Sequence, residues 1–194
     1  GDVYKRQDVD YSFSGKNVML RGVTTSAEAK AALLNGLSKA DYQVMDCLQV
    51  LPDEAALEGK TYGIINVSVS NLRVDPDFSS EMMTQGLMGM PVRVLQRDGW
   101  YRIQTPDNYI AWVHRVGIHP VTKEELHVWN RAEKIVVTSH YGFVYSEPNQ
   151  SSQTVSDVVA GNRLKWEGTK GAFYKVAYPC LLYTSDAADD LIGV

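Results

Sequence analysis

The fold is decided by residues 89–113, which read GMPVRVLQRDGWYRIQTPDNYIAWV. Apolar and polar residues alternate from Val92 onward, which is the pattern of a half-buried strand. Asp98-Gly99 favours a tight hairpin, and residues 105–108 form a second turn before the apolar run 109–113. Short strands spaced so closely bury a core only when their sheet curls on itself. The stretch therefore predicts a small β-barrel within a mainly β fold.

The same pattern occurs twice, at a fixed offset of 72 residues. The pairs that show this offset are Pro76 with Pro148, Ser79 with Ser151, Gly89 with Gly161, Val92 with Leu164, and Gly99 with Gly171. After Gly171 the offset grows to 73, as in Tyr101 with Tyr174 and Pro106 with Pro179, which one inserted turn residue explains. The repeat predicts SH3-like barrels over 62–118 and 134–179. The second is expected to be truncated, because it stops before a counterpart of strand 109–113.

One further segment lies between the barrels and another precedes them. In the linker 119–133, Thr122 and Glu125 form a capping box ahead of an apolar stripe, which predicts a short helix between the barrels. Residues 8–58 hold an Ala- and Leu-rich stretch at 27–39 between strand-like runs at 17–22 and 42–51. We interpret them as a β-α-β segment of a separate small domain. The sequence assigns this segment no function.

The two ends of the chain indicate an artificial origin. Residues 2–7, DVYKRQ, are encoded by one strand of a transposon-end adapter used in sequencing libraries, and residues 180–185, CLLYTS, by its other strand. We therefore predict that 1–7 and 180–194 are translated adapter, and exclude them from the fold. The natural part is then a metagenomic fragment of a longer protein that continues past Pro179. An open edge of the truncated barrel can pair with residues 181–183 as an accident of the adapter.

Composition excludes several classes of function. The chain has 194 residues and a net charge of −4, so no basic field recruits nucleic acid or anionic lipid. The sequence lacks an apolar run of about 18 residues, so no membrane span is predicted. Cys180 lies in the adapter, which leaves Cys47 without a disulfide partner. The Cys and His spacings predict no metal site, and we expect no cofactor.

Residues 67–73, 89–94, 98–101 and 109–113 together resemble, in order, the pattern of the bacterial SH3 domain. The second unit is more divergent, with Tyr141–Tyr145 where the family usually has an Asn-Leu-Arg element. Tandem domains of this kind, joined by a helical linker, resemble the non-catalytic front half of NlpC-type cysteine peptidases. Those enzymes cut the stem peptides of bacterial peptidoglycan, and their papain-like domain follows the second barrel.

This resemblance implies a function for the chain. It implies a non-catalytic region that targets the cell wall and gates substrate access in a stem-peptide cysteine endopeptidase, whose C-terminal peptidase domain is missing from the fragment. The implied partners are a peptidoglycan stem peptide or muropeptide and that missing domain. The implied location is the bacterial cell envelope, either periplasmic or secreted. The alternative is a free-standing SH3-like adaptor that binds a protein partner in the envelope.

No catalytic residue is predicted within the fragment. The nucleophile of the resembled peptidases lies in an Asp-Cys-Ser-Gly element, and Asp46-Cys47 matches its first half, but Leu48 follows. We expect Cys47 to be a buried structural residue of a strand. The histidines are scattered, and none forms a recognisable pair with Cys47: they are His114, His119, His127 and His140.

Ligand binding is the chemistry that the first barrel favours, because it carries four closely spaced aromatic residues. Strand alternation predicts that Tyr101 and Trp112 belong to the core. Trp100 and Tyr109 lie beside turns and are expected to reach solvent, where they offer rigid contact area for a ligand.

The resemblance extends this expectation to a site, because the first barrel of such enzymes forms one wall of the peptidase cleft. We predict a ligand-binding site made of Tyr109, Trp100, Arg73 and Asp75. Arg73 is expected to pair with a carboxylate of the stem peptide. A surface salt bridge between Arg73 and Asp75 is the competing interpretation.

Overall fold

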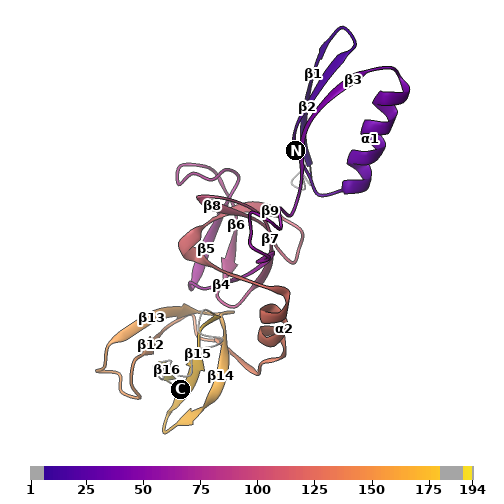
Figure 1. Ribbon diagram of the computed structural model, residues 1–194. Helices are drawn as coiled ribbons and strands as arrows, with labels where there is room; N and C mark the ends of the chain where they lie inside the picture. The colour runs from indigo at the N-terminus through magenta and orange to yellow at the C-terminus, as the bar shows by residue number, and fades with distance from the viewer. Residues whose placement is uncertain (1–6, 180–189, 194) are drawn as a thin grey trace.

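The computed structural model describes residues 7–179 and 190–193. Figure 1 shows three bodies in chain order: a small sheet with one helix, and then two β-rich units that lie against each other with a second helix beside them. The predicted fold class is confirmed. The described residues form a mainly β fold of two SH3-like barrels in tandem, joined by a short helix and preceded by a small β-α-β segment.

The N-terminal body is a three-stranded sheet of order β1-β2-β3 with one helix, and its elements are β1 Gln7–Ser14, β2 Asn17–Thr24, α1 Ala27–Lys39 and β3 Gln43–Val50. Strands β2 and β3 run parallel, so α1 is the crossover that parallel strands require. The helix begins where the Ser26 hydroxyl accepts the backbone N–H of Ala29. Strand β1 pairs antiparallel with β2 and extends the predicted β-α-β segment by one strand.

One face of this sheet carries the helix, and Cys47 lies on the other. Leu34 and Leu37 of α1 pack toward the buried Val18, Leu20 and Leu48. Successive residues of a strand point to opposite faces, so Cys47, next to Leu48, points away from the helix. Its thiol is exposed. The prediction of a buried structural cysteine is therefore wrong, because helix α1 covers the face of β3 opposite Cys47.

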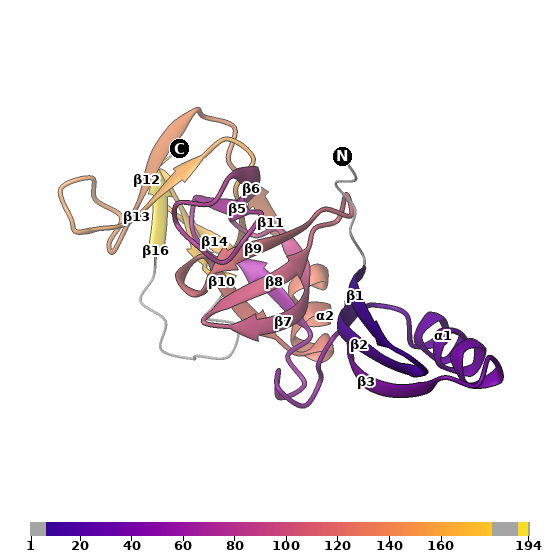
Figure 2. The same cartoon turned by 90° about the horizontal axis from the view of Figure 1, so that it is seen from above.

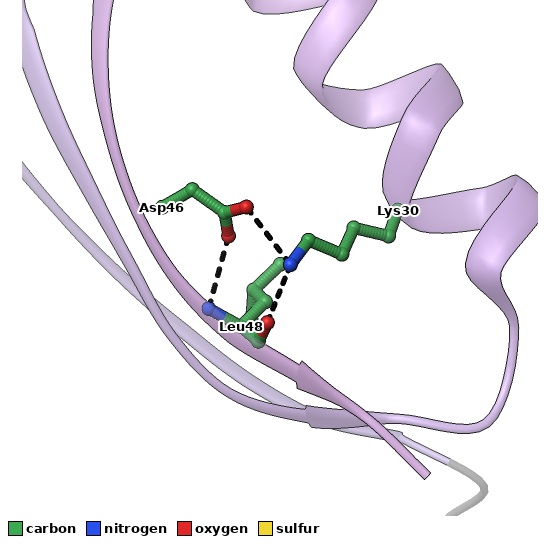
Figure 3. A network of polar contacts seen from close by, with 3 residues as sticks. All are labelled: Lys30, Asp46 and Leu48. Carbon is green, nitrogen blue, oxygen red and sulfur yellow. Dashed lines mark hydrogen bonds and ion pairs between the residues drawn. The ribbon is translucent and has the colours of Figure 1, made fainter.

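Helix α1 is tied to β3 by a polar network (Figure 3). The Lys30 ammonium lies 2.8 Å from an Asp46 carboxylate oxygen and donates a hydrogen bond to the Leu48 carbonyl at 2.5 Å. The other Asp46 oxygen accepts the backbone N–H of Leu48 at 3.0 Å. The hydrogen bond from Lys30 is the main cause that holds the pKa of the Asp46 carboxyl below its usual range. The carboxylate next to Cys47 therefore fixes the helix.

Barrel 1 is a seven-stranded sheet of order β10-β4-β7-β8-β9-β5-β6, with β4 Tyr62–Ile65, β5 Val69–Arg73, β6 Met82–Leu87, β7 Pro91–Asp98, β8 Trp100–Gln104, β9 Ile110–His114 and β10 Ile118–Val121. The predicted hairpin forms at Gly99, which has φ +66°. The core is formed by alternate residues of these strands, and four fully buried members are Leu72, Val94, Ile103 and Val113.

A β-bulge joins barrel 1 to the N-terminal body. The register of β7 against β8 shifts between Val94 and Gln96, which leaves Leu95 outside the regular pairing. Leu95 is buried with Leu51 and Ile110, and Val23 of β2 packs against this group. The bulge thus adds an outward-facing apolar side chain to a barrel strand, and that side chain anchors the N-terminal body.

Barrel 2 repeats this arrangement as a six-stranded sheet of order β11-β14-β15-β16-β12-β13, with β11 Lys134–Val136, β12 Tyr141–Tyr145, β13 Thr154–Val159, β14 Arg163–Lys170, β15 Phe173–Ala177 and β16 Asp190–Gly193. Strand β16 stands between β15 and β12, the place that β9 takes between β8 and β5. Excluding all of 180–194 from the fold is therefore wrong for 190–193. Residues 181–183, the predicted accidental partners, lie outside the described residues.

Helix α2, Lys123–Arg131, follows β10 and packs by its tryptophan. The capping box is present: the Glu125 N–H donates to the Thr122 hydroxyl, and the Thr122 N–H donates to the Glu125 carboxylate. Trp129 is 1% exposed, among Ile64 and Val121. Its indole N–H donates to the carbonyl of Gly89 at 3.2 Å. The predicted connecting helix is confirmed.

The two barrels share core residues across their junction. Met88, in the turn between β6 and β7 of barrel 1, is fully buried in the core of barrel 2. Its carbonyl accepts the N–H of Arg163 at 2.9 Å. Gly89 has φ +84°, and a Cβ there would lie 2.3 Å from the Arg163 carbonyl oxygen. The close approach of the two turns therefore requires a glycine.

A buried asparagine completes this junction. The side chain of Asn162 is fully buried, donates to the Ser68 carbonyl of barrel 1 at 2.8 Å, and accepts the N–H of Val159 at 3.0 Å. The Ser68 hydroxyl in turn donates to the Asp157 carboxylate at 2.7 Å. Buried polar groups are stabilising when they are paired in this way. The barrels thus meet through packed and hydrogen-bonded surfaces.

Candidate binding site on barrel 1

The loop between β5 and β6 is built by its own hydrogen bonds. The Asp75 N–H donates to the Ser80 hydroxyl at 3.0 Å, and the Asp77 carboxylate accepts both the N–H and the hydroxyl of Ser79 at 2.7 Å. These bonds from Ser79 are the largest cause of the lowered pKa of the Asp77 carboxyl, and the charge of Arg73 contributes. The loop therefore holds a carboxylate in its charged form at the surface.

Arg73 supports the same loop at its base. Its guanidinium donates to the carbonyl of Ser80 at 2.6 Å. Arg73 and Asp75 do not form an ion pair with each other among the residues that the structure describes. The salt-bridge interpretation of these two residues is therefore wrong.

An aromatic cluster stands beside this loop. The Trp100 ring lies 4.8 Å from that of Phe78 and 5.0 Å from that of His114, measured between centroids, and Phe78 and His114 are 4.9 Å apart. Trp100 and His114 are register partners at one end of the β8–β9 ladder, and Phe78 reaches them from the β5–β6 loop. Phe78 is 66% exposed. Sequence reasoning missed it, although a phenylalanine within a polar turn is itself a signal.

Comparison with the corresponding loop of barrel 2 shows which side chains the loop conformation requires. The corresponding loop of barrel 2 makes the same bonds: Ser152 receives the N–H of Glu147, and Asn149 receives that of Ser151. At the offset of 72, however, Arg73 corresponds to Tyr145 and Phe78 to Gln150. A loop of this kind therefore forms in barrel 2 without an arginine or a phenylalanine at these positions.

Tyr109 lies away from this cluster. Its N–H donates to the Thr105 hydroxyl at 3.0 Å, and its carbonyl accepts the Thr105 N–H at 2.9 Å, in the turn before β9. Trp100 and this turn are at opposite ends of β8, which at about 3.4 Å per residue are roughly 15 Å apart. The structure brings Trp100, Arg73 and Asp75 to one region through Phe78, and leaves Tyr109 apart.

The two aromatic residues expected in the core differ from each other. Tyr101 is half-buried and packs against the barrel core. Trp112 is also half-buried, but its neighbours Ala111 and Val113 are the core residues, so Trp112 points outward beside Arg102. The core prediction for Trp112 is wrong, because Val113, and not Trp112, is paired with Tyr101 and shares its inward face.

The cysteine and the histidines lie on separate elements in the part of the chain that the structure describes. This part of the chain holds no group of three or more His, Cys, Asp or Glu residues placed to bind a metal ion. Cys47 is in β3, whereas His114 is in β9 and His127 in α2. Among the described helices, neither is long and apolar enough to cross a membrane.

Comparisons with known proteins identify the class of barrel 1. Residues 72–117 match the family described as the bacterial dipeptidyl-peptidase Sh3 domain. This match runs from the end of β5 through β9, including the loop and the aromatic cluster. The resemblance of the first unit to a bacterial SH3 domain is thereby confirmed.

Solved structures extend the likeness to the wider fold. An NlpC/P60 family protein from Bacillus cereus is 18% identical with a TM-score of 0.51, over 68% of this chain and 53% of that one. An NlpC/P60 endopeptidase from Photobacterium damselae subsp. piscicida is 14% identical with a TM-score of 0.48, over 74% of this chain and 33% of that one. None of the curated proteins compared matches the chain. The chain thus spans about half the length of the Bacillus protein, whose fold it shares over that part.

Proposed function

We propose that this chain is the non-catalytic, wall-targeting and substrate-gating region of a cysteine endopeptidase that cuts peptidoglycan stem peptides in the bacterial cell envelope. The match of residues 72–117 to the dipeptidyl-peptidase Sh3 domain carries this proposal. The NlpC/P60-like arrangement of the fold supports it. The catalytic residues belong to a peptidase domain of the natural protein that lies outside this sequence.

The side chains of barrel 1 fit a short charged peptide. The Arg73 guanidinium supplies hydrogen-bond donors for a terminal carboxylate. Phe78, Trp100 and His114 offer ring surface for apolar side chains such as the methyl group of alanine. Asp75 supplies an acidic group for a free amine. In this proposal the loop and the aromatic cluster form one wall of a cleft, and the peptidase domain forms the other.

Tyr109 has a separate place in the proposal. It lies beside Ile110, which packs against the N-terminal body, so it stands where that body meets barrel 1. A ligand that contacts both Tyr109 and the aromatic cluster therefore extends along the length of β8. For this reason Tyr109 is tested by its own variant rather than with Trp100.

The sequence of the natural gene distinguishes this proposal from the alternative, a free-standing adaptor. A coding sequence with an Asp-Cys-Ser-Gly element and a later histidine downstream of Pro179 supports the peptidase. A stop codon directly after Pro179 in the natural gene supports the adaptor and contradicts the gating role.

The isolated chain is expected to bind a soluble stem peptide with a dissociation constant of roughly millimolar or weaker. One wall of a cleft leaves most of the ligand in water, while the entropy cost of association must still be met. NMR titration should shift the resonances of residues 73–80 and Trp100, and Arg73→Gln should remove these shifts. The matched control is Phe143→Ala in barrel 2, which should leave them unchanged. Micromolar binding would show a site complete within the chain, and shifts confined to barrel 2 would exclude the site on barrel 1.

A further inference from the structure

A row of aromatic side chains follows the outer face of β12 in barrel 2. Tyr141, Phe143 and Tyr145 alternate with Gly142 and the fully buried Val144, so the three rings share the face that points away from the core. Tyr141 is 58% and Phe143 is 39% exposed. In Figure 2, β12 lies at the end of the molecule far from the N-terminal sheet.

The rings contact one another in sequence. Centroid distances are 5.0 Å from Tyr141 to Phe143 and 6.4 Å from Phe143 to Tyr145. Phe173 of β15 continues the row, 6.4 Å from Tyr145. We call these four residues the β12 aromatic row.

The repeat shows that the barrel fold does not need this row. At the offset of 72, Val144 corresponds to Leu72, and both are fully buried. The outward positions differ: Tyr141, Phe143 and Tyr145 correspond to Val69, Asn71 and Arg73. In barrel 1 the middle position is polar, and Asn71 accepts a hydrogen bond from Gln85. Barrel 2 therefore exposes three aromatic rings where a barrel of the same fold does not.

The chemistry of the row favours an uncharged ligand. Its members carry no formal charge, in contrast to Arg73 at the position that corresponds to Tyr145. Across the ladder, the residue paired with Phe143 is Asp157, whose negative charge disfavours a peptide with free carboxylates. The tyrosine hydroxyls add hydrogen-bonding groups at the edge of the apolar surface.

The size and shape of the β12 aromatic row favour a single polymer strand as its ligand. An aromatic side chain buries about 150–250 Å², so the exposed parts of these rings amount to roughly 300 Å². A stable protein interface needs about 800 Å² from each partner. The planes of Tyr141 and Phe143 differ by 79°, so the row is not a flat platform for a crystalline surface. A single linear polymer, whose successive units present their faces in different orientations, fits both properties.

We propose that the β12 aromatic row binds the sugar rings of a single polysaccharide strand. A pyranose ring has apolar C–H faces that pack on aromatic rings, and hydroxyl groups at its edge for the tyrosines. The polymer class rests on the proposed function: in the cell wall it is the glycan strand of N-acetylated amino sugars. Barrel 2 then holds the glycan, while barrel 1 contacts the stem peptide attached to it.

The test is an NMR titration of the chain with a soluble hexamer of β-1,4-linked N-acetylglucosamine, and separately with a stem peptide without sugar. The hexamer should shift the resonances of Tyr141, Phe143 and Tyr145. Tyr141→Ala with Phe143→Ala should weaken binding by roughly tenfold for each ring removed. Both side chains are exposed, and the thermal melt reports whether the variant is folded.

The matched control replaces the corresponding outward residues of barrel 1, Val69→Ala with Asn71→Ala, which should leave hexamer binding unchanged. Shift mapping on the unaltered chain decides the question even if the variant does not fold. No shift at millimolar hexamer overturns the proposal, as do shifts confined to barrel 1. If the stem peptide rather than the hexamer shifts β12, the row is a peptide site. The stem-peptide site on barrel 1 has its own variant, Arg73→Gln, so either proposal can fail alone.

Discussion

Replacing Trp129 by alanine is expected to lower the free energy of unfolding by about 3–5 kcal/mol. The ring is 1% exposed between α2 and barrel 1, and its loss leaves a large cavity. The substitution also removes the indole N–H that donates to the Gly89 carbonyl at the junction of the barrels. Urea unfolding followed by far-UV circular dichroism measures the change.

The matched control for Trp129 is its helical neighbour. Val128 lies on the same helix but is 44% exposed, so Val128→Ala should change the free energy of unfolding by no more than about 0.5 kcal/mol. Equal losses from the two substitutions would show that α2 is stabilised by helix propensity and does not pack as described.

Replacing Met88 by alanine is expected to lower the free energy of unfolding by about 2–5 kcal/mol, with the effect centred on barrel 2. Met88 belongs to a turn of barrel 1 but is fully buried among Val144, Val158 and Leu164 of barrel 2. Hydrogen exchange should show that the amides of β12 to β15 lose protection.

Met82 of β6 provides the control for Met88, because it is a methionine of the same barrel with 49% exposure. Met82→Ala should leave the exchange of barrel 2 unchanged. If Met88→Ala destabilises barrel 1 alone, the barrels do not share a core, and the description of the junction is wrong.

Local chemistry made much of the fold predictable. Asp98-Gly99 specifies its hairpin, and the Thr122 and Glu125 capping box specifies the start of α2, because each depends on residues close together in the chain. The repeat then predicted the second barrel from the first. Strand β1 is not one of the predicted strands of the β-α-β segment, although residues 8–13 alternate polar with apolar side chains as a half-buried strand does.

The errors concern properties that depend on distant parts of the chain. Cys47 is exposed because it lies on the face of the sheet opposite helix α1, and the sequence of a single strand does not show which face a helix covers. Met88 resembles any apolar turn residue until barrel 2 packs around it. Phe78 joins Trp100 only because the loop folds back across the β8–β9 ladder. Strand β16 pairs with both β15 and β12, which are distant from each other in the chain.

The central claim is that this chain targets the cell wall, and cosedimentation with purified peptidoglycan sacculi tests it most directly. Many weak contacts along a repeating polymer retain a protein even when a single soluble unit binds at millimolar strength. The account predicts that the unaltered chain pellets with sacculi and that Trp100→Ala and Tyr109→Ala, each made separately, reduce the pelleted fraction. Retention that neither substitution changes would exclude Trp100 and Tyr109 from the binding site, and a chain that stays in the supernatant would contradict the account.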